Sequence, residues 1–417
     1  MKVWILQTGE PLQIDSDGFR PMRAMNLADQ LTSKGHEVVL WSSDFNHFTK
    51  KHRFGREETI QVSNLLKIKL IPSRGYLSHN GFARLVDHAQ LGFNLSRMLR
   101  RENTRPDVAF LGYPPIEPAW ALTNWLKRHH IPAILDVKDA WPDVLVNHFP
   151  RSVQNFAKLG LFPYFLMMKS IFKKVTGFSS VTQEFLDWCL VKSGREQTQN
   201  DFVVPLTSQD VDTTEEEILK EEFWWDEFGI TNDGKLRGYF VGSISSAFNF
   251  DPIISTARKY PSVEFVIAGD GPNLKELIDQ TKEIPNIFWP GWINTKQALV
   301  LASRSSFALA PLRPRTDFEM SIPNKFYDAM KYGKPIFTSL KGPASKIVLD
   351  SGSGKIYGDG VSNSLEVLIS DLILDSSKLE AMSKNSRLVY ENYFNFEKVY
   401  SGLVHKIEKI ARGNQTH

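Results

Sequence analysis

The sequence lacks the features of disulfide-stabilised secreted proteins and of membrane-spanning proteins. Its 417 residues contain one cysteine, Cys189, so no disulfide can form within the chain, which is compatible with a reducing compartment. Cys189 lies in an apolar stretch with a helical pattern, which predicts a buried, inert thiol. No apolar run approaches the roughly 20 residues of a spanning helix, and no signal-peptide pattern follows Met1. We expect a cytoplasmic protein that does not cross a membrane.

Motifs of several enzyme classes are also missing. There is no G-x-G-x-x-G and no P-loop lysine, which disfavours dinucleotide and ATP binding. The histidines lack zinc spacing, no G-x-S-x-G elbow supports Ser-His-Asp chemistry, and no nucleic-acid-binding module is recognisable. One D-x-D occurs at Asp210 and Asp212, but in a polar segment instead of at an apolar strand end. We therefore expect no metal, no cofactor and no nucleic-acid partner.

Charge is unevenly distributed along the chain. The first 200 residues contain 26 Lys+Arg and 18 Asp+Glu, a net charge of +8, whereas the remainder carries −5. Such a division bears on surfaces and partners and not on the fold. It fits either a chance difference between two domains or a basic surface on the first.

The order of apolar runs indicates parallel α/β architecture, because short β-rich runs alternate with helical patterns almost throughout. A chain of this length rarely has one core. The expected strands are Val3–Thr8, Glu37–Ser42, Lys67–Pro72, Asp107–Gly112, Ala133–Val137, Phe178–Thr182, Phe202–Val204, Gly238–Gly242, Val263–Ala268, Ile287–Trp289, Phe307–Ala310 and Pro335–Thr338. The expected helices include Pro21–Lys34, Trp120–His129, Gln183–Lys192, Asn273–Lys282, Thr295–Ser303, Pro323–Tyr332 and a long stretch from Leu379 to Ile410.

Two doubly wound units are the simplest organisation. An acid-rich segment without strand pattern, residues 207–233, separates the two series of strands. We expect an N-terminal domain over residues 1–205, a linker with a short helix over 206–236, and a C-terminal domain over 237–385. The last residues, 386–417, are expected to form a helix that packs back on the first domain.

Several motifs carry a family resemblance. The stretches FVIAGDGP (265–272), NIFWPGWINTKQALVLASRSSFALAPL (286–312) and IPNKFYDAMKYGKPIFTS (322–339) resemble the C-terminal half of family-four retaining glycosyltransferases. The glycine loop after the first strand, GHEVVLW (35–41) and DVKDAWPD (136–143) agree with the N-terminal half. The resemblance implies the GT-B fold, an α/β architecture in which two Rossmann-like doubly wound domains face a cleft. The motif IPNK is similar to the branch that assembles bacterial polysaccharides.

The resemblance implies a nucleotide-diphospho-sugar donor bound mainly to the C-terminal domain, with retention of configuration and no metal. Gly269, Asp270 and Gly271 would line the donor site, and backbone near Ile293 would meet the base. Gly242, after the first strand of this domain, belongs to the same set. In the N-terminal domain, Gly9 begins a polar loop running to Gly18, which either presents backbone N–H groups to an anion or sugar or is an ordinary surface loop.

Two acids eight positions apart are usual in the family. Asp328 matches the second, suited to ribose hydroxyls because a carboxylate accepts two hydrogen bonds. Met320 occupies the first position, and Glu319 is displaced by one. The family's Arg and Lys after the first strand of the second domain are also absent, since residues 241–257 contain no basic side chain. Lys325, near a helix start, and Arg313 are the candidate cations for the leaving diphosphate, each with the alternative of a solvated surface residue.

On the acceptor side, Asp139 follows a buried strand and is a candidate to orient or deprotonate the acceptor hydroxyl. The alternative is a structural cap or an ion pair with Lys138, where the family often has histidine. The expected catalytic residues are thus Asp139 and Lys325, and the acceptor is a saccharide or a lipid-linked saccharide.

A membrane surface is a further expected partner. Residues 159–168 are apolar and are followed by Lys169, Lys173 and Lys174, a pattern that suits either an interfacial segment on an anionic membrane or a buried core helix. Arg97, Arg100 and Arg101 form a second basic cluster. We expect peripheral attachment at the inner face of the cell membrane.

Two other functions remain open from the sequence. A nucleotide-sugar epimerase would share the fold, and a non-catalytic transferase-like subunit would explain the missing Arg–Lys pair and the displaced glutamate.

Overall fold

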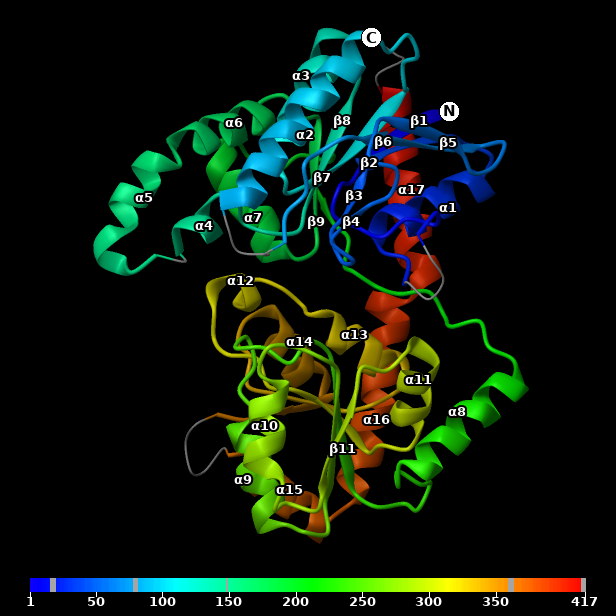
Figure 1. Ribbon diagram of the computed structural model, residues 1–417, viewed down its shortest axis with the longest axis vertical. Coiled ribbons are helices and arrows are strands. Elements are labelled where there is room, and N and C mark those ends of the chain that lie inside the picture. Colours follow the sequence, from blue (N-terminus) through cyan, green and yellow to red (C-terminus); the bar gives the residue numbers. More distant parts are fainter. Residues whose placement is uncertain (16–19, 78–81, 148, 359–363, 414–417) are drawn as a thin grey trace. The chain divides into compact units, whose positions relative to one another are not determined.

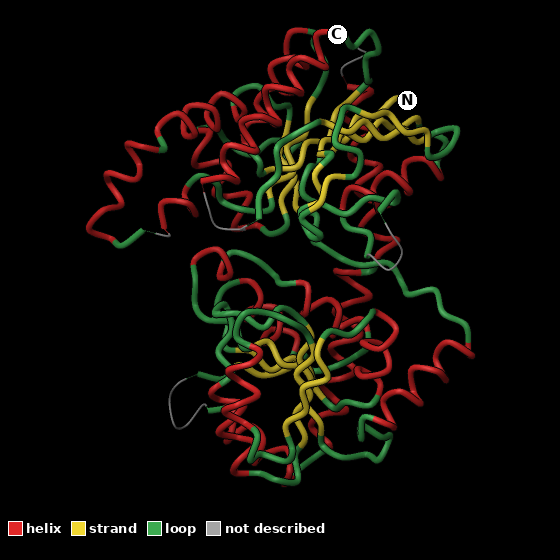
Figure 2. Tube along the Cα trace, in the orientation of Figure 1, coloured by secondary structure: helices red, strands yellow, loops and turns green. Residues whose placement is uncertain are grey.

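The computed structural model describes residues 1–15, 20–77, 82–147, 149–358 and 364–413 (Figure 1). The chain divides into two compact units. Unit 1 comprises Met1–Pro205 and Glu397–His417, and unit 2 comprises Leu206–Phe396. Strands and helices alternate in both units (Figure 2), as the sequence pattern predicts, and each unit has its own sheet.

The sheet of unit 1 contains, within the described residues, eight strands in the order β10-β9-β8-β7-β1-β2-β6-β5. All neighbours are parallel except β5, which pairs antiparallel with β6 at the edge. The central strands β1, β7 and β8 are buried on almost every residue, as expected when helices cover both faces of a parallel sheet. The strands are β1 (Lys2–Leu6), β2 (Glu37–Ser43), β5 (Glu58–Gln61), β6 (Leu66–Ile71), β7 (Val108–Tyr113), β8 (Ala133–Val137), β9 (Gly177–Ser180) and β10 (Phe202–Val203).

Helices lie on both faces of this sheet (Figure 1). One layer contains α2 (Phe82–Arg100), α3 (Ile116–Arg128), α6 (Phe162–Phe172) and α7 (Gln183–Ser193). The other layer contains α1 (Arg23–Ser33) and the last helix, α17 (Phe396–Gly413). Asn26 Nδ2 of α1 donates to the hydroxyl of Tyr400 at 3.3 Å, and His36 Nε2 lies 2.9 Å from Glu408 Oε1. These contacts attach the end of the chain to unit 1.

Shorter elements complete unit 1. They are the hairpin of β3 (Phe45–Asn46) and β4 (Lys51–His52), the helices α4 (Asp143–Asn147) and α5 (Gln154–Gly160), and the single turn η1 (Arg151–Val153). Cys189 on α7 is fully buried, which confirms the predicted burial, and burial raises the pKa of its thiol.

The sheet of unit 2 is parallel in all its pairings, in the order β13-β12-β11-β14-β15-β16. Its strands are β11 (Arg237–Val241), β12 (Glu264–Ala268), β13 (Ile287–Gly291), β14 (Phe307–Ala310), β15 (Ile336–Thr338) and β16 (Gly354–Ile356). Its helices are α8 (Glu215–Glu227), α9 (Asp251–Lys259), α10 (Leu274–Thr281), α11 (Thr295–Ser303), α12 (Thr316–Glu319), α13 (Asn324–Lys331), α14 (Pro343–Ser351), α15 (Leu365–Leu374) and α16 (Ser377–Val389).

Alternating side chains of β12 build two cores, one on each face of this sheet. Phe265 and Ile267 pack in a cluster with residues of α9 and α15. Val266 and Ala268 pack in a second cluster with residues of α11, α13 and α14. The period of two along the strand accounts for this division, and it explains why the sequence of the strand is apolar at each of these positions.

The predicted fold class, two doubly wound α/β units, is confirmed, and the predicted strands match the parallel strands to within one or two residues. The prediction omitted β3, β4, β5 and β16, which are short or lie at an edge and so carry little periodic signal. The predicted helix from Leu379 to Ile410 is interrupted by a π-helical turn at Tyr390–Phe394. The acid-rich segment contains α8, whose start is a Thr214–Glu217 capping box.

Candidate active site

The carboxyl end of the second sheet has the topology of a ligand site. Strand β11 lies between β12 and β14, so the chain leaves β11 toward one edge of the sheet and later returns to build the other. In open α/β sheets, ligands bind outside the carboxyl ends of the strands at this switch point. The loops after β11 and β14 meet there, since Asn249 N donates to Pro311 O at 2.7 Å and Arg313 N to Ala247 O at 2.9 Å.

Three predicted glycines allow two loop backbones to touch at this point. Gly242 N donates to Ala268 O at 3.0 Å, and Ile244 N donates to Asp270 O at 2.9 Å. A Cβ on Gly269 would lie 1.8 Å from Gly242 O, and one on Gly271 would lie 2.3 Å from Ile244 O. Gly269 also has a φ of +140°, which residues with a Cβ rarely adopt. The structure therefore brings Gly242, Gly269 and Gly271 together in one backbone-lined corner.

Lys325 reaches the same corner from the first turn of α13. Its Nζ donates to the carbonyl of Val241 at 3.0 Å and lies 4.2 Å from the ring centroid of Phe240 and 4.6 Å from that of Phe248. A Cβ on Gly242 would stand 2.3 Å from this Nζ. Burial lowers the pKa of the ammonium group to about 8, and Asp328 acts in the opposite direction. A partly desolvated cation at a helix start suits a diphosphate.

Asp328 lies one turn further along α13. Its Oδ1 accepts a hydrogen bond from Ser208 Oγ at 3.2 Å. Lys331 Nζ donates to Gln209 O at 2.7 Å and lies 2.9 Å from Asp210 Oδ1. These contacts hold residues 208–210 against the helix that carries Lys325 and Asp328.

The other predicted donor residues take different positions. Ile293 is buried in the core beyond the end of β13, next to the exposed Trp292. The side chains of Asp270 and Arg313 are exposed, and Asp270 Oδ1 accepts from Gly271 N at 2.7 Å. Glu319 ends α12, and its backbone packs against Gly342, where an added Cβ would lie 1.9 Å from Glu319 O. The structure thus brings Lys325 against the glycine corner, whereas the side chains of Asp270 and Arg313 are exposed.

Unit 1 has a hollow at the equivalent edge of its own sheet, where β1, β2, β7 and β8 end. Its volume is about 300 Å³, at the lower end of the range of ligand pockets. Gly9 and Asp139 both line it, which places these two predicted residues together within unit 1. The hollow is lined by Gln7, Thr8, Gly9, Glu10, Met22, Ser43, Phe45, His47, Tyr76, Arg84, Asp87, His88, Leu91, Tyr113, Pro114, Pro115, Lys138 and Asp139. Ser16, Asp17 and Gly18 of the loop that Gly9 begins are outside the described residues.

Asp139 makes local contacts in the structure. Its Oδ1 accepts from Ala140 N at 2.8 Å, and its Oδ2 accepts from Trp141 Nε1 at 3.1 Å. Lys138 is directed to Glu10, with which it forms an ion pair. Both Lys138 and Asp139 border the hollow.

A buried ionic network supports this edge of the sheet. Asp136 at the end of β8 is fully buried and lies 3.4 Å from Arg23 Nε. Ser179 Oγ donates to its Oδ1 at 2.8 Å, and Lys138 Nζ is 3.8 Å from its Oδ2. Glu10 Oε2 accepts from Ala24 N at 2.8 Å. Because buried charges require partners, this network fixes the loop that bears Gly9 and Glu10.

Tyr76, Arg84 and His88 line the hollow but were not singled out in the sequence. His88 and Arg84 are one helical turn apart on α2, and this i, i+4 spacing is the signal that could have found them. Tyr76 follows β6 in a loop without a recognisable pattern. The tertiary structure is needed to bring it to the edge where Asp139 lies.

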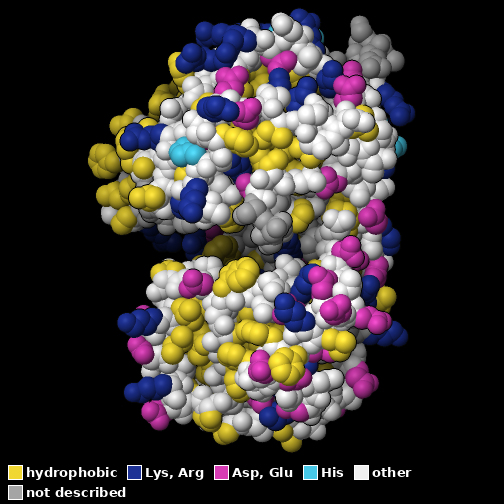
Figure 3. Space-filling view, turned by 45° about the vertical axis from the view of Figure 1, so that its right-hand side comes forward, with side chains coloured by type: hydrophobic (Ala, Val, Ile, Leu, Met, Phe, Trp, Pro, Cys, Tyr) yellow, Lys and Arg dark blue, Asp and Glu magenta, His cyan; other side chains and the backbone are white. Residues whose placement is uncertain are grey.

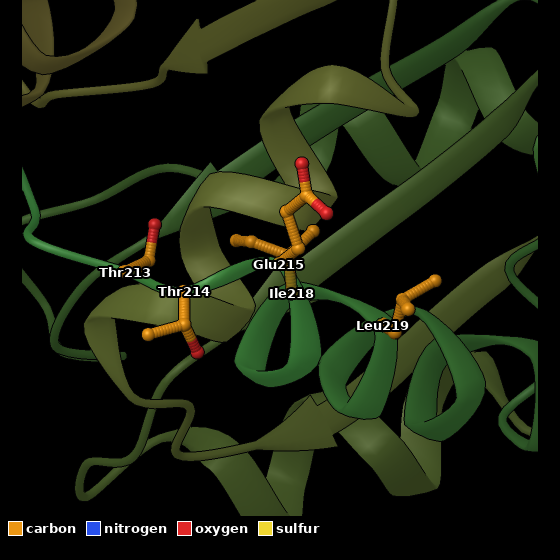
Figure 4. Close-up of a pocket in the computed structure, with 5 residues that line it drawn as sticks. All are labelled: Thr213, Thr214, Glu215, Ile218 and Leu219. Carbon is orange, nitrogen blue, oxygen red and sulfur yellow. The ribbon is translucent and has the colours of Figure 1, made fainter.

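A second hollow, of about 330 Å³, lies at the start of α8 and is lined by Thr213, Thr214, Glu215, Ile218 and Leu219 (Figure 4). Its residues come from one helix and the turn before it. The hydroxyl of Thr214 is used in the helix cap, and Glu215 would repel an anion. The D-x-D motif lies just before this turn, and Asp210 is ion-paired with Lys331. In the described part of the chain, no three His, Cys, Asp or Glu side chains are grouped to hold a metal ion.

Comparison with known families identifies the domain in unit 2. Residues 226–389 match the family described as glycosyl transferases group 1. The matched range includes the glycine corner, Lys325 and Asp328. Residues 226–389 form a group 1 glycosyl transferase domain. The predicted resemblance to glycosyltransferases is therefore confirmed over this part of the chain, and the domain contains each of the predicted donor residues except Gly9.

Solved structures resemble this chain over nearly its whole length. Sucrose-phosphate synthase from Thermosynechococcus elongatus aligns with a TM-score of 0.72 and 12% identity, over 99% of each chain. HepE from Anabaena, in complex with UDP and glucose, aligns with a TM-score of 0.65 and 13% identity, over 98% of this chain and 100% of that chain. WaaG, a glycosyltransferase involved in lipopolysaccharide biosynthesis, aligns with a TM-score of 0.65 and 12% identity, over 98% of this chain and 99% of that chain. These similarities confirm the GT-B fold.

A UDP-N-acetylglucosamine 2-epimerase is similar at a lower TM-score of 0.55, with 14% identity over 97% of this chain and 94% of that chain. The search of curated proteins found no match to this chain in sequence. Among the helices in the described ranges, none combines the length and apolar character needed to span a bilayer.

Proposed function

We propose that this glycosyltransferase moves a sugar, with retention of configuration and without a metal, from a nucleotide-diphospho-sugar to a saccharide acceptor. The observation that carries the proposal is the position of Lys325 beside the glycine corner, at the switch point of a group 1 glycosyl transferase domain. The proposal that the donor is a nucleotide-sugar is further supported by HepE, whose structure holds UDP and glucose.

The chemistry needs a cation where the nucleoside diphosphate departs. As the bond to the anomeric carbon breaks, negative charge grows on the leaving phosphate oxygen, and a preorganised donor there lowers the barrier. Lys325 supplies that charge, and the backbone of the glycine corner leaves room for the diphosphate to approach. Asp328 would accept hydrogen bonds from the ribose hydroxyls. On the acceptor side, Asp139 would orient the attacking hydroxyl in the hollow of unit 1.

The donor proposal is tested with the intact protein and a thermal-unfolding panel of UDP-, GDP-, ADP- and dTDP-sugars, because a bound ligand stabilises the folded state by mass action. A transfer assay then measures release of nucleoside diphosphate with and without a saccharide acceptor. A transferase releases it mainly with acceptor, an epimerase releases or rearranges donor without one, and a non-catalytic subunit does neither. Retention is read from the anomeric configuration of the product, and metal independence from unchanged turnover in a chelator.

We further propose that the acceptor is lipid-linked, in polysaccharide assembly, and that unit 1 docks on the inner, cytoplasmic face of an anionic membrane. The supporting surface is the α5–α6 hairpin, here defined as residues 149–172. No residue of α5 is buried, and α6 buries only Met168, Ile171 and Phe172, so the alternative of a buried core helix is wrong for most of this segment. Large apolar side chains are exposed on it, namely Phe149, Val153, Phe156, Leu159, Phe162 and Leu166.

Basic side chains accompany this apolar surface. Lys158, Lys169 and Lys173 are exposed, and the space-filling view shows hydrophobic and basic side chains side by side on an outer lobe of unit 1 (Figure 3). Lys174 is instead hydrogen-bonded to Asn124 and Ser170 at 2.6 Å each. Apolar area combined with charges worth about 1 kcal/mol each near an acidic surface favours interfacial binding. WaaG, which resembles this chain in fold, is involved in lipopolysaccharide biosynthesis.

Vesicle co-sedimentation tests the docking. The intact protein should bind vesicles rich in phosphatidylglycerol, bind phosphatidylcholine vesicles less, and dissociate as salt is added. The triple variant K158E/K169E/K173E and the variant F156S/L159S should both bind at least about tenfold more weakly. The matched control, L219S/F223S, removes two apolar side chains that are also largely exposed, from α8 of unit 2, and should bind as the wild type does. Equal loss in the control, or no binding to anionic vesicles at low salt, contradicts the proposal.

A further inference from the structure

The end of α13 is a basic turn that leads into the amino end of β15. Gly333 adopts a φ of +63° directly after the helix, the left-handed conformation in which helices commonly end. Gly333 N donates to Met330 O at 3.0 Å, and Lys334 N donates to Ala329 O at 2.9 Å. The turn, residues 331–334, therefore carries two lysines, Lys331 and Lys334, three positions apart.

A hollow of about 510 Å³ lies over this turn, within the size range of ligand pockets. The turn lines it together with Leu299 and Ser303 of α11 and Arg387 of α16. Three of the lining side chains are cations, and among the described residues no carboxylate lines the hollow. Its lining is thus positive, with Leu299 and the ring of Tyr332 as apolar surface.

Lys334 is a half-buried cation in this lining. Its Nζ donates to the carbonyl of Ser305 at 2.8 Å, and no ion pair of Lys334 occurs in the described part of the chain. Burial lowers the pKa of its ammonium group. An ammonium group has three donors, and a charge withdrawn from water without a counter-charge is unfavourable. An anion in the hollow would supply that counter-charge.

The other two cations have carboxylate partners outside the hollow. Lys331 is 4% exposed, and its Nζ donates to Gln209 O at 2.7 Å and lies 2.9 Å from Asp210 Oδ1. Arg387 donates to the carbonyl of Lys331, and its Nη2 lies 2.5 Å from Glu391 Oε1. Three cations thus share two carboxylates. Because like charges that are close together disfavour their charged forms, this excess also favours an anionic ligand.

The hollow is separate from the glycine corner. Lys325 stands in the first turn of α13 and Lys331 at its end, so their backbones are roughly 9 Å apart along the helix axis. The glycine corner lies at the carboxyl end of β11, whereas Ser305, the partner of Lys334, precedes the amino end of β14. In a parallel sheet these ends lie at opposite edges. A ligand of the hollow is therefore distinct from the donor.

We propose that this hollow is a second anion site of unit 2, which binds a phosphate monoester through Lys334 and Arg387 in the positive field that Lys331 adds. The phosphate of such an ester is mostly dianionic at neutral pH, and guanidinium and ammonium groups are the side chains that recognise it. Leu299 and Tyr332 offer contacts to the organic part of the ester. The site rests on the lining of unit 2 and not on the proposed function.

Lysine labelling of the full chain with pyridoxal phosphate, itself a phosphate monoester, tests the site. Its aldehyde forms an imine with a lysine amine, which borohydride fixes and peptide mass spectrometry locates. Lys334 should be labelled at least about tenfold more by pyridoxal phosphate than by pyridoxal, which lacks the phosphate. The exposed Lys346 of α14 is the matched control, and its labelling corrects for the different reactivity of the two aldehydes.

Competitors identify what carries the phosphate. Glucose 1-phosphate should protect Lys334 and leave Lys346 unprotected. Protection by phosphatidic acid vesicles, and not by glucose 1-phosphate, would support the site and assign the ester to a lipid headgroup. Arg387→Gln should reduce the labelling of Lys334 by pyridoxal phosphate at least about tenfold, whereas Arg387→Lys keeps the charge and should retain most of it.

Thermal unfolding of both variants separates loss of binding from loss of fold. Equal labelling of Lys334 by the two aldehydes, no protection by any phosphate monoester, or unchanged labelling in folded Arg387→Gln overturns the proposal. In these outcomes the cations of the turn serve only to cap the ends of α11 and α13. Failure of the proposed function is a different result: no nucleotide-sugar protects Lys325 and no transfer occurs, while the labelling of Lys334 still depends on the phosphate.

Discussion

The ammonium group of Lys325 donates to the carbonyl oxygen of Val241 at 3.0 Å, in the space that a side chain on Gly242 would occupy. A cation from the start of α13 is thereby held against the carboxyl end of β11. In the proposed function, Lys325 takes the place of the Arg–Lys pair that the family has after this strand. The first two predictions follow from this contact.

Lys325→Ala should lower turnover by about a hundredfold or more, the scale of removing one preorganised donor to a developing negative charge. Because burial places the pKa of Lys325 at about 8, the ammonium form is lost as pH rises through this value. The wild-type kcat/KM for donor should therefore fall above about pH 8. Arginine stays protonated there, so Lys325→Arg, where active, should not show this alkaline decrease. Near-normal turnover of Lys325→Ala would contradict the role of the cation.

Gly242→Ala should reduce donor affinity and turnover by displacing Lys325, since the added Cβ would stand 2.3 Å from Nζ. The side chain of Lys325 is flexible, so the effect on thermal unfolding should be small. Gly269→Ala is different, because its Cβ would meet the backbone oxygen of Gly242 at 1.8 Å, and it should destabilise unit 2. In the Lys325→Ala background, Gly242→Ala should cost little further activity. Additive losses in this double-mutant cycle would show that the two residues act independently.

Asp328→Ala should weaken nucleotide binding measured by calorimetry, through loss of the acceptor for the ribose hydroxyls. The carboxylate also accepts a hydrogen bond from Ser208, so Ser208→Ala is the matched control. It removes the same contact with residues 208–210 but leaves the carboxylate in place. If both variants weaken binding equally, Asp328 acts by holding this segment and not by holding the ribose.

Asp139→Asn should leave donor binding unchanged and reduce transfer sharply, since it keeps the shape of the side chain and removes its charge. Asp139 also accepts hydrogen bonds from Ala140 N and Trp141 Nε1, so the alternative to an acceptor role is that it holds the loop after β8. Trp141→Phe removes the indole donor and tests that role separately. Transfer at the wild-type rate in Asp139→Asn, with a loss confined to thermal stability, would assign Asp139 to the loop and not to the acceptor.

Much of the fold was readable from the sequence because parallel α/β units repeat strong local signals. The strand Phe265–Ala268 is apolar at every position, since it is covered on both faces, and Gly35 and Thr295 stand near predicted helix boundaries. Gly269 and Gly271 were predicted from the motif they belong to. The physical reason for glycine at these positions is the contact of two loop backbones, which the motif alone does not reveal.

The pattern of residues by itself determined the two series of strands and the buried cysteine, because each depends on neighbours within a few positions, whereas the glycines were predicted from a family resemblance. Only the tertiary structure decided that Lys325 stands beside Gly242, that residues 149–172 expose their apolar side chains, and that His88 lines a hollow with Asp139. Each of these relations joins segments far apart in the chain or depends on what a helix packs against. Local periodicity contains no information on long-range contacts or on the packing partner of a helix. The same apolar helix pattern occurs in helices of the core and of the surface, and a lysine in the sequence can lie in solvent or in a binding site.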